Sequence, residues 1–128
     1  MVSLMDIALW VCQVLLAIGF IGAAYVHAVL WEKTSANVQM RWLADIGHQR
    51  ALGIGTLEVA GGVGVIAPAV TDILVWLTPL AATGLTLLMI SAIIFHVVRH
   101  EYPNIAINLI LGLLAAFVAY GRFVLVPL

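Results

Sequence analysis

Charged side chains are scarce in this chain of 128 residues. They make up 9% of the sequence, as 5 Lys plus Arg and 6 Asp plus Glu, whereas about a quarter is usual in soluble domains. The formal net charge of -1 offers no basic surface to a nucleic-acid backbone. The single cysteine, Cys12, cannot form a disulfide, a CxxC redox pair or a zinc knuckle within one chain. A water-soluble enzyme and a nucleic-acid partner are therefore not expected.

Long apolar runs fill the sequence instead. Hydrophobic residues make up 65% of the chain and the mean hydropathy is +1.20. A transmembrane helix needs about 20 apolar residues to cross a hydrocarbon core of about 30 Å. We predict four such spans, at about 7–30, 51–70, 73–95 and 104–126, within a single transmembrane domain over 1–128. The expected fold class is all-α, an integral membrane four-helix bundle in the lipid bilayer.

The basic residues predict an orientation. Lys33, Arg41 and Arg50 fall in the first connection and Arg99 in the third, whereas Arg122 is the one basic residue at the C-terminal end. The positive-inside rule then places the first and third connections in the cytoplasm. Both termini would face outside, and the expected location is a bacterial inner (plasma) membrane.

Within the first connection, Val38, Trp42 and Ile46 recur at helical spacing. We predict a short amphipathic helix here, lying on the membrane interface between the first two spans. Thr34 or Ser35 is the expected cap at its start. An irregular polar loop is the alternative.

Glu58 is the most informative polar residue, because it follows Ala51 by seven positions and so lies roughly 10 Å inside the bilayer. An ionisable group at this depth is a candidate for function. It could relay a proton or bind a hydroxyl group of a ligand. The alternative is a purely structural role, in which Glu58 joins two helices through hydrogen bonds.

Other polar residues should lie at the same end of the bundle. His27 lies about one turn before the end of the first span, His96 closes the third, and Asn104 and Asn108 open the fourth on one helical face. We predict that Glu58, His27 and His96 form one catalytic cluster and that Asn108 binds the ligand. For either histidine, the alternative is a ring that meets water at the interface.

A bound metal is not expected. His96 and His100 have the i, i+4 spacing of a metal-binding face, and two histidines on different helices could ligate a haem iron. Axial ligands must lie at matched depths across a haem-sized gap, however, and nothing in the sequence indicates this. Haem is therefore not the cofactor that we expect.

Gly55 and Gly62 lie on the same helical face as Glu58, at i−3 and i+4. They could leave a crevice for a ligand beside the carboxyl group, or allow close helix packing. Arg122, near the outer end of the fourth span, is a further candidate ligand-binding residue. The alternative is that the guanidinium group of Arg122 binds no ligand, and instead extends outward to water or pairs with Asp72 or Asp6.

Several motifs resemble the DoxX-like family of small membrane proteins. The stretches that carry the resemblance are GFIGAAYVH at 19–27, RALG at 50–53, LEVAGG at 57–62, PLAA at 79–82 and FVAYGRF at 117–123. The resemblance implies a four-helix membrane protein whose relatives include the small subunit of a thiosulfate:quinone oxidoreductase and partners of redox enzymes. Glu58, His96, Asn108 and Arg122 match recurring family positions, whereas His27 stands where a lysine is usual.

The leading functional hypothesis is a membrane subunit that binds a lipophilic small molecule, a quinone being favoured, in redox or proton-coupled chemistry. Since the sequence has no electron carrier, a redox enzyme partner would supply the electrons. One alternative is a non-catalytic scaffold or assembly factor, and another is a small lipid-modifying enzyme, such as an isomerase that uses Glu58 with His27 or His96. A homo-oligomer remains open.

Overall fold

The computed structural model describes residues 2–128, which fold into helices joined by short turns. Four helical segments are long and apolar enough to cross a membrane. They are α1 (Leu4–Ala24) with the π-helix η1 (Tyr25–Val29), α4 (His48–Thr71), α5 (Leu77–Val98), and α6 (Tyr102–Tyr120) with the π-helix η3 (Gly121–Leu125). This confirms the prediction of an all-α, four-helix membrane protein.

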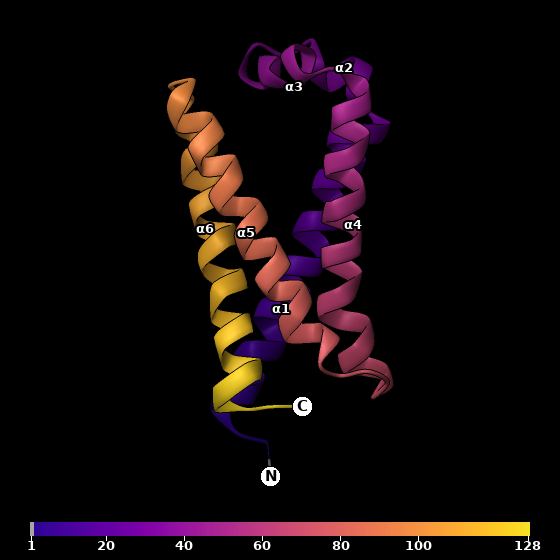
Figure 1. The fold of residues 1–128 in the computed structure, drawn as a ribbon, viewed down its shortest axis with the longest axis vertical. Helices are drawn as coiled ribbons and strands as arrows, with labels where there is room; N and C mark the ends of the chain where they lie inside the picture. Colours follow the sequence, from indigo (N-terminus) through magenta and orange to yellow (C-terminus); the bar gives the residue numbers. More distant parts are fainter. Residues whose placement is uncertain (1) are drawn as a thin grey trace.

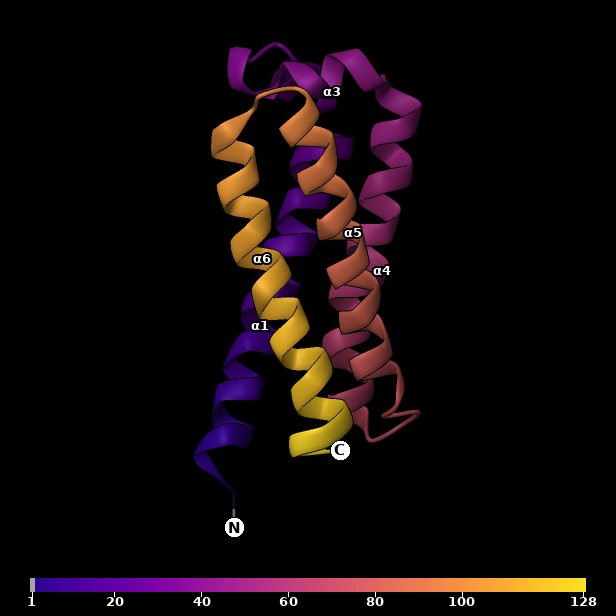
Figure 2. The same cartoon turned by 60° about the vertical axis from the view of Figure 1, so that its left-hand side comes forward.

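The helices form two pairs that diverge toward one end. Helix α1 packs along α4, and α5 packs along α6. Figure 1 shows both chain termini at the lower end, where the pairs lie close together, and Figure 2 shows the same arrangement from another side. At the opposite end the first connection crosses over the bundle, and we call this the α3 end.

The first connection differs from the single amphipathic helix that was predicted. It consists of α2 (Trp31–Ser35), the 3-10 helix η2 (Val38–Met40) and α3 (Arg41–Ile46). The cap predicted at Thr34 or Ser35 is wrong, because the side chain of Asn37 accepts the backbone N–H of Gln39 at the start of η2. The Thr34 hydroxyl instead donates to the carbonyl oxygen of Val26.

Helix α3 directs its apolar residues into the bundle. Trp42 is only 7% exposed and Leu43 is buried, and both pack with Ala51 of α4. Val38, which the same helical spacing placed on their face, is 78% exposed because it belongs to a separate short helix. Trp42 is therefore an interior side chain and does not face the membrane interface.

The core between the spanning helices is small and closely packed. Its buried residues are Leu16, Phe20, Val65, Ala82, Leu85, Met89, Ala115 and Val118. A Cβ atom at Gly61 would clash with the side chain of Leu85, so this glycine allows α4 and α5 to approach.

Most of the apolar surface points outward. In the spanning segments, between 17% and 39% of the residues in the most apolar window are buried inside the protein. Large aliphatic side chains such as Ile18 and Leu113 are more than half exposed along the spans. A bilayer is the environment in which such a surface is stable, so the chain is an integral membrane protein.

Candidate functional site

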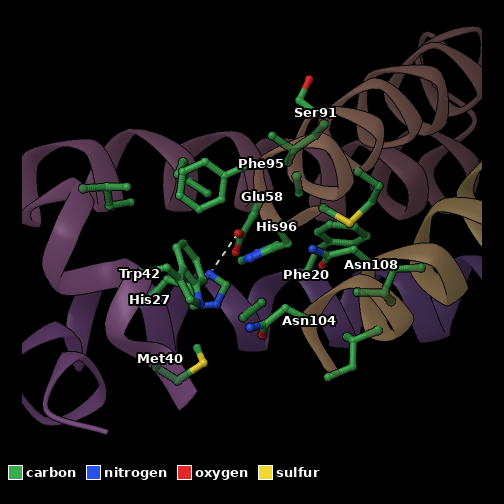
Figure 3. Close-up of a pocket in the computed structure, with 18 residues that line it drawn as sticks. Phe20, His27, Met40, Trp42, Glu58, Ser91, Phe95, His96, Asn104 and Asn108 are labelled. Carbon is green, nitrogen blue, oxygen red and sulfur yellow. Dashed lines mark hydrogen bonds and ion pairs between the residues drawn. The ribbon is translucent and has the colours of Figure 1, made fainter. Parts of the chain in front are cut away.

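A cavity of about 380 Å³ opens between the two helix pairs at the α3 end. Its walls are mainly apolar and include Phe20, Met89 and Phe95, while Trp42 of α3 contributes the wall nearest the connection (Figure 3). Six further lining residues have polar side chains, namely His27, Glu58, Ser91, His96, Asn104 and Asn108. Apolar walls with a few convergent polar groups are typical of small-molecule sites.

Glu58 and His27 form a hydrogen-bonded pair inside this cavity. The Nδ1 atom of His27 lies 3.0 Å from Oε1 of Glu58, and the Glu58 side chain is buried (Figure 3). His27 belongs to the π-helix η1, a type of helical segment that is often found at functional sites. The second carboxyl oxygen, Oε2, is buried and has no hydrogen-bond partner among residues 2–128. The carboxyl group thus has hydrogen-bonding capacity that the described residues do not use.

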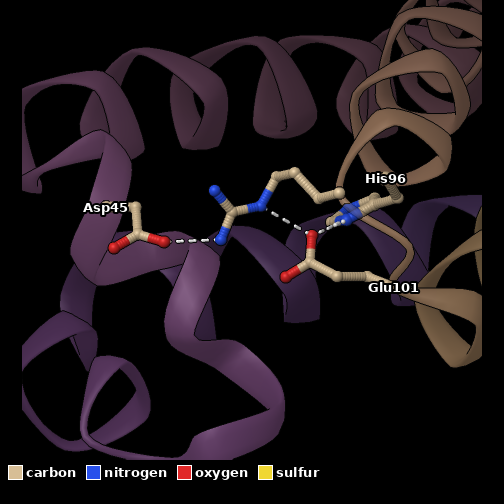
Figure 4. Close-up of polar contacts among 4 residues, drawn as sticks. Asp45, His96 and Glu101 are labelled. Carbon is tan, nitrogen blue, oxygen red and sulfur yellow. Dashed lines mark hydrogen bonds and ion pairs between the residues drawn. The ribbon is translucent and has the colours of Figure 1, made fainter.

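His96 forms a second pair, with Glu101 in the turn before α6. Its Nδ1 atom lies 2.9 Å from Oε1 of Glu101, and the Nε–H of Arg99 donates to the same oxygen at 2.9 Å (Figure 4). Arg99 also donates to Asp45 of α3, which attaches α3 to the end of α5. The outer side of this cluster meets water, since Arg99 and Asp45 are 30% and 46% exposed.

Electrostatics keep Glu101 ionised. Burial acts to raise the pKa of Glu101, but hydrogen bonds from Arg99 and His96 outweigh it and lower the pKa below its ordinary value. Because an ionised carboxylate only accepts hydrogen bonds, Nδ1 of His96 must carry a hydrogen atom, and this N–H group donates a hydrogen bond to Glu101. In a neutral His96 ring, Nε2 is then the atom with a free lone pair.

Trp42 lies between the two histidines. Its ring meets the rings of His27 and His96 edge-on, each at a centroid distance of 5.2 Å, and packs edge-on against Phe95 at 6.2 Å. The indole Nε1–H is buried and has no hydrogen-bond acceptor within the described part of the chain. Two residues that line the cavity thus each have a buried polar atom without a partner, this nitrogen and Oε2 of Glu58.

Asn104 and Asn108 of α6 also line the cavity (Figure 3). Both side chains are half-buried. Each amide group can donate and accept hydrogen bonds. They extend the polar part of the cavity along one face of α6, as the i, i+4 spacing predicted.

Two predicted site residues, Gly55 and Gly62, lie against α1 and are absent from the cavity lining. A Cβ atom at Gly55 would come within 2.9 Å of Ala28 Cβ, and one at Gly62 within 3.0 Å of Ile21 Cγ1. Their position corresponds to the alternative of close helix packing.

Arg122 lies at the opposite end of the bundle, away from the cavity. Its Nε donates to Oε1 of Gln13 at 2.8 Å, and its Nη1 donates to Oδ1 of Asp6 at 2.6 Å. The guanidinium group also lies over the ring of Trp10. Arg122 is 2% exposed, and its ion pair with the partly buried Asp6 joins η3 to α1.

The structure therefore gathers Glu58, His27, His96 and Asn108 in one cavity. Sequence reasoning missed two further residues, Trp42, which lines the cavity, and Glu101, which lies outside the lining and is bonded to His96. Glu101 carried no signal, because it follows the end of a helix and reaches His96 only through the turn. Trp42 was visible only as an apolar position of the first connection. No group of three or more His, Cys, Asp or Glu side chains in residues 2–128 could hold a metal ion.

The model of the DoxX-like family matches residues 11–118 of the chain. The matched range includes Glu58, His27, His96 and Asn108 and ends before Arg122. No curated protein and no solved structure matches the chain.

Proposed function

Because the chain belongs to the DoxX-like family, we propose that it binds a quinone in the cavity at the α3 end. In this proposal it acts as a membrane subunit in redox or proton-coupled chemistry, and a partner enzyme supplies the electrons. The partner would dock at the α3 end, because the cavity in which the quinone would receive the electrons lies there. The proposal concerns a lipophilic ligand because the cavity lies between membrane-spanning helices.

The size and lining of the cavity suit such a ligand. Its volume of about 380 Å³ falls in the range of about 300–1,000 Å³ that is common for small-molecule sites. Phe20, Met89 and Phe95 provide apolar and aromatic walls for a ring. Ser91 and Ile107 line the cavity and are also exposed on spanning helices, so a ligand has access from the bilayer.

The observation that carries the proposal is the state of Glu58. Its carboxyl group is buried, bonded to His27 through Oε1 and unpaired at Oε2, and Glu58 lines an apolar cavity between spanning helices. A carboxyl group held next to a histidine can give or take a proton. Reduction of a quinone consumes protons as well as electrons, so it requires such a group within reach.

The remaining polar residues have separate roles in the proposal. His27 shares the proton of Glu58, while Nε2 of His96 is available for a second hydrogen bond to the ligand. Glu101 is a positioning residue, because it fixes the His96 ring through Nδ1. Asn104 and Asn108 orient the ligand through their amide groups.

We also propose an orientation in which the α3 end faces the cytoplasm of a bacterial cell and both termini face outside. Lys33, Arg41 and Arg99 belong to connections at the α3 end, and Arg50 lies in the first turn of α4 at the same end. This distribution supports the orientation through the positive-inside rule. A reporter enzyme that is active only outside the cytoplasm, fused to the C-terminus, should be active.

The test is mass spectrometry of the organic extract from the full chain purified in mild detergent. We expect a bound quinone in the wild-type extract and its loss in Glu58→Ala. Glu32→Ala is the matched control, because Glu32 is exposed on α2 and does not line the cavity. Because the ligand could be lost during purification, the wild type and both variants are also titrated with an added short-chain quinone. The proposal would be contradicted if the wild type carried no bound quinone and also failed to bind added quinone.

A further inference from the structure

Two unpaired polar atoms in the cavity specify the hydrogen-bonding character of its ligand. Oε2 of Glu58 and Nε1 of Trp42 have no partner in the structure described for residues 2–128. Glu58 is 3% exposed and Trp42 is 7% exposed, so water has little access to either. Because a buried polar group without a partner is destabilising, both atoms call for a ligand that pairs with them.

The nitrogen of Trp42 can only donate. An indole N–H has no lone pair to offer, so its partner must be an acceptor. The ring is also held in place, since His27, His96 and Phe95 contact it edge-on. The donor therefore has a fixed position in the cavity wall.

The free oxygen of Glu58 is an acceptor. Its other oxygen, Oε1, forms the hydrogen bond with Nδ1 of His27. If the shared proton resides on His27, the carboxylate accepts at both oxygens. If it resides on Oε1, then Oε2 is the carbonyl oxygen of the acid and again accepts. In both of these states the partner of Oε2 must donate, whereas a proton on Oε2 itself would make this oxygen the donor. A hydroxyl group can be the partner in every state, because it both donates and accepts.

We infer that the cavity recognises a hydroxyl group on an apolar molecule, its oxygen accepting from Trp42 Nε1–H and its proton donated to Glu58 Oε2. This inference rests on the proposed function and makes it more specific. While Oε2 carries no proton, the site selects the quinol within the quinone couple, because a quinone carbonyl accepts but cannot donate. Trp42 thereby becomes a ligand-binding residue. A long-chain isoprenoid alcohol carries the same hydroxyl chemistry and is the other source of such a ligand.

The experiment compares ligands that differ only at the oxygen. The full chain in mild detergent is equilibrated without oxygen against a short-chain benzoquinol, its quinone and its dimethyl ether, and bound ligand is measured by equilibrium dialysis. We expect the quinol to bind about tenfold more tightly than the quinone or the ether, because each of these lacks the donor for Glu58. Geranylgeraniol and its methyl ether form the second pair, which tests the isoprenoid alcohol.

Trp42→Phe tests the donor, since phenylalanine keeps an aromatic ring but has no N–H. We expect this variant to lose about fivefold in affinity for the quinol. Trp76→Phe is the matched control, because Trp76 is 56% exposed and lies just before α5 at the end of the bundle opposite α3. Its affinity for the quinol should remain at the wild-type value.

The possible outcomes separate this inference from the proposed function. Equal binding of quinol, quinone and ether, with no effect of Trp42→Phe, would overturn the hydroxyl inference but leave the quinone proposal standing. Binding of the isoprenoid alcohol alone, with its ether excluded, would support the inference and overturn the quinone proposal. If none of these compounds binds, both are wrong. The ligand pairs give this answer with the wild-type chain even if a variant fails to fold.

Discussion

Nδ1 of His27 and Oε1 of Glu58 lie 3.0 Å apart, and 31 residues of sequence separate the two side chains. The contact joins the last turns of the first spanning segment to α4, so it couples helix packing to the chemistry of the cavity. Because one hydrogen bond joins the two side chains, the donor or acceptor role of each depends on that of the other. A change at either residue therefore alters the hydrogen-bonding capacity of the other.

Exchange of Glu58 for glutamine should change ligand preference. In Glu58→Gln the amide oxygen can accept from His27, which places the NH₂ group where Oε2 now lies. This group donates, so we expect the preference for quinol over quinone to disappear or reverse while the protein still folds. Dialysis with the quinol and quinone measures the ratio of affinities. An unchanged ratio would show that Oε2 does not contact the ligand.

Glu101 should make stability depend on pH. Its pKa is lowered because hydrogen bonds from Arg99 and His96 outweigh burial, which acts in the opposite direction. The stabilisation is therefore fully present above the ordinary value of 4.5 and is lost as the pH falls through the lowered pKa. Since Arg99 is partly exposed, we expect a contribution of about 1 kcal/mol.

Thermal unfolding in detergent across the acid range measures this effect. Glu101→Gln should melt below the wild type at neutral pH, and the two curves should converge in acid. Glu32→Gln should follow the wild type throughout, because Glu32 is exposed on α2. A constant difference between Glu101→Gln and the wild type at every pH would argue against an ionised Glu101.

The close approach of α4 and α5 should be sensitive to one methyl group. In Gly61→Ala the added Cβ would clash with Leu85, so we expect a loss of roughly 1–3 kcal/mol of stability. Gly22→Ala provides the control, since no atom lies within 4 Å of the position of its Cβ. Chemical unfolding of both variants in detergent gives the comparison. Equal stability of the two would mean that α4 and α5 shift apart at no cost.

The buried ion pair at the end opposite α3 should be essential for folding. Arg122→Met leaves Asp6 without its guanidinium partner and Gln13 without the donor of its hydrogen bond. We expect a loss of roughly 3–5 kcal/mol, as is typical when one partner of a buried pair is removed. Arg41→Met, at an exposed position, should be close to neutral. Addition of Asp6→Asn to Arg122→Met should restore part of the stability.

The spans and part of the site could be predicted because depth in the bilayer follows from position along an apolar helix. The depth argument predicted that Glu58, His27 and His96 lie together at one end of the bundle. The structure brings all three to one cavity. Helix rotation does not follow from hydropathy, so the direction that Gly55 and Gly62 face could not be known. The partners Trp42 and Glu101 depend on how the connections fold back over the bundle, which no periodic pattern encodes.

The exposed positions of Ser91 and Ile107 at the cavity mouth determine how any affinity must be expressed. Both residues belong to spanning helices, so the ligand of the proposed function would arrive by lateral diffusion within one leaflet and would not need to cross water. Its effective concentration is the mole fraction in the lipid, and a larger volume of lipid or detergent dilutes it. Binding curves for this protein should therefore coincide when they are plotted against mole fraction in lipid or detergent, and separate when they are plotted against molarity in the buffer.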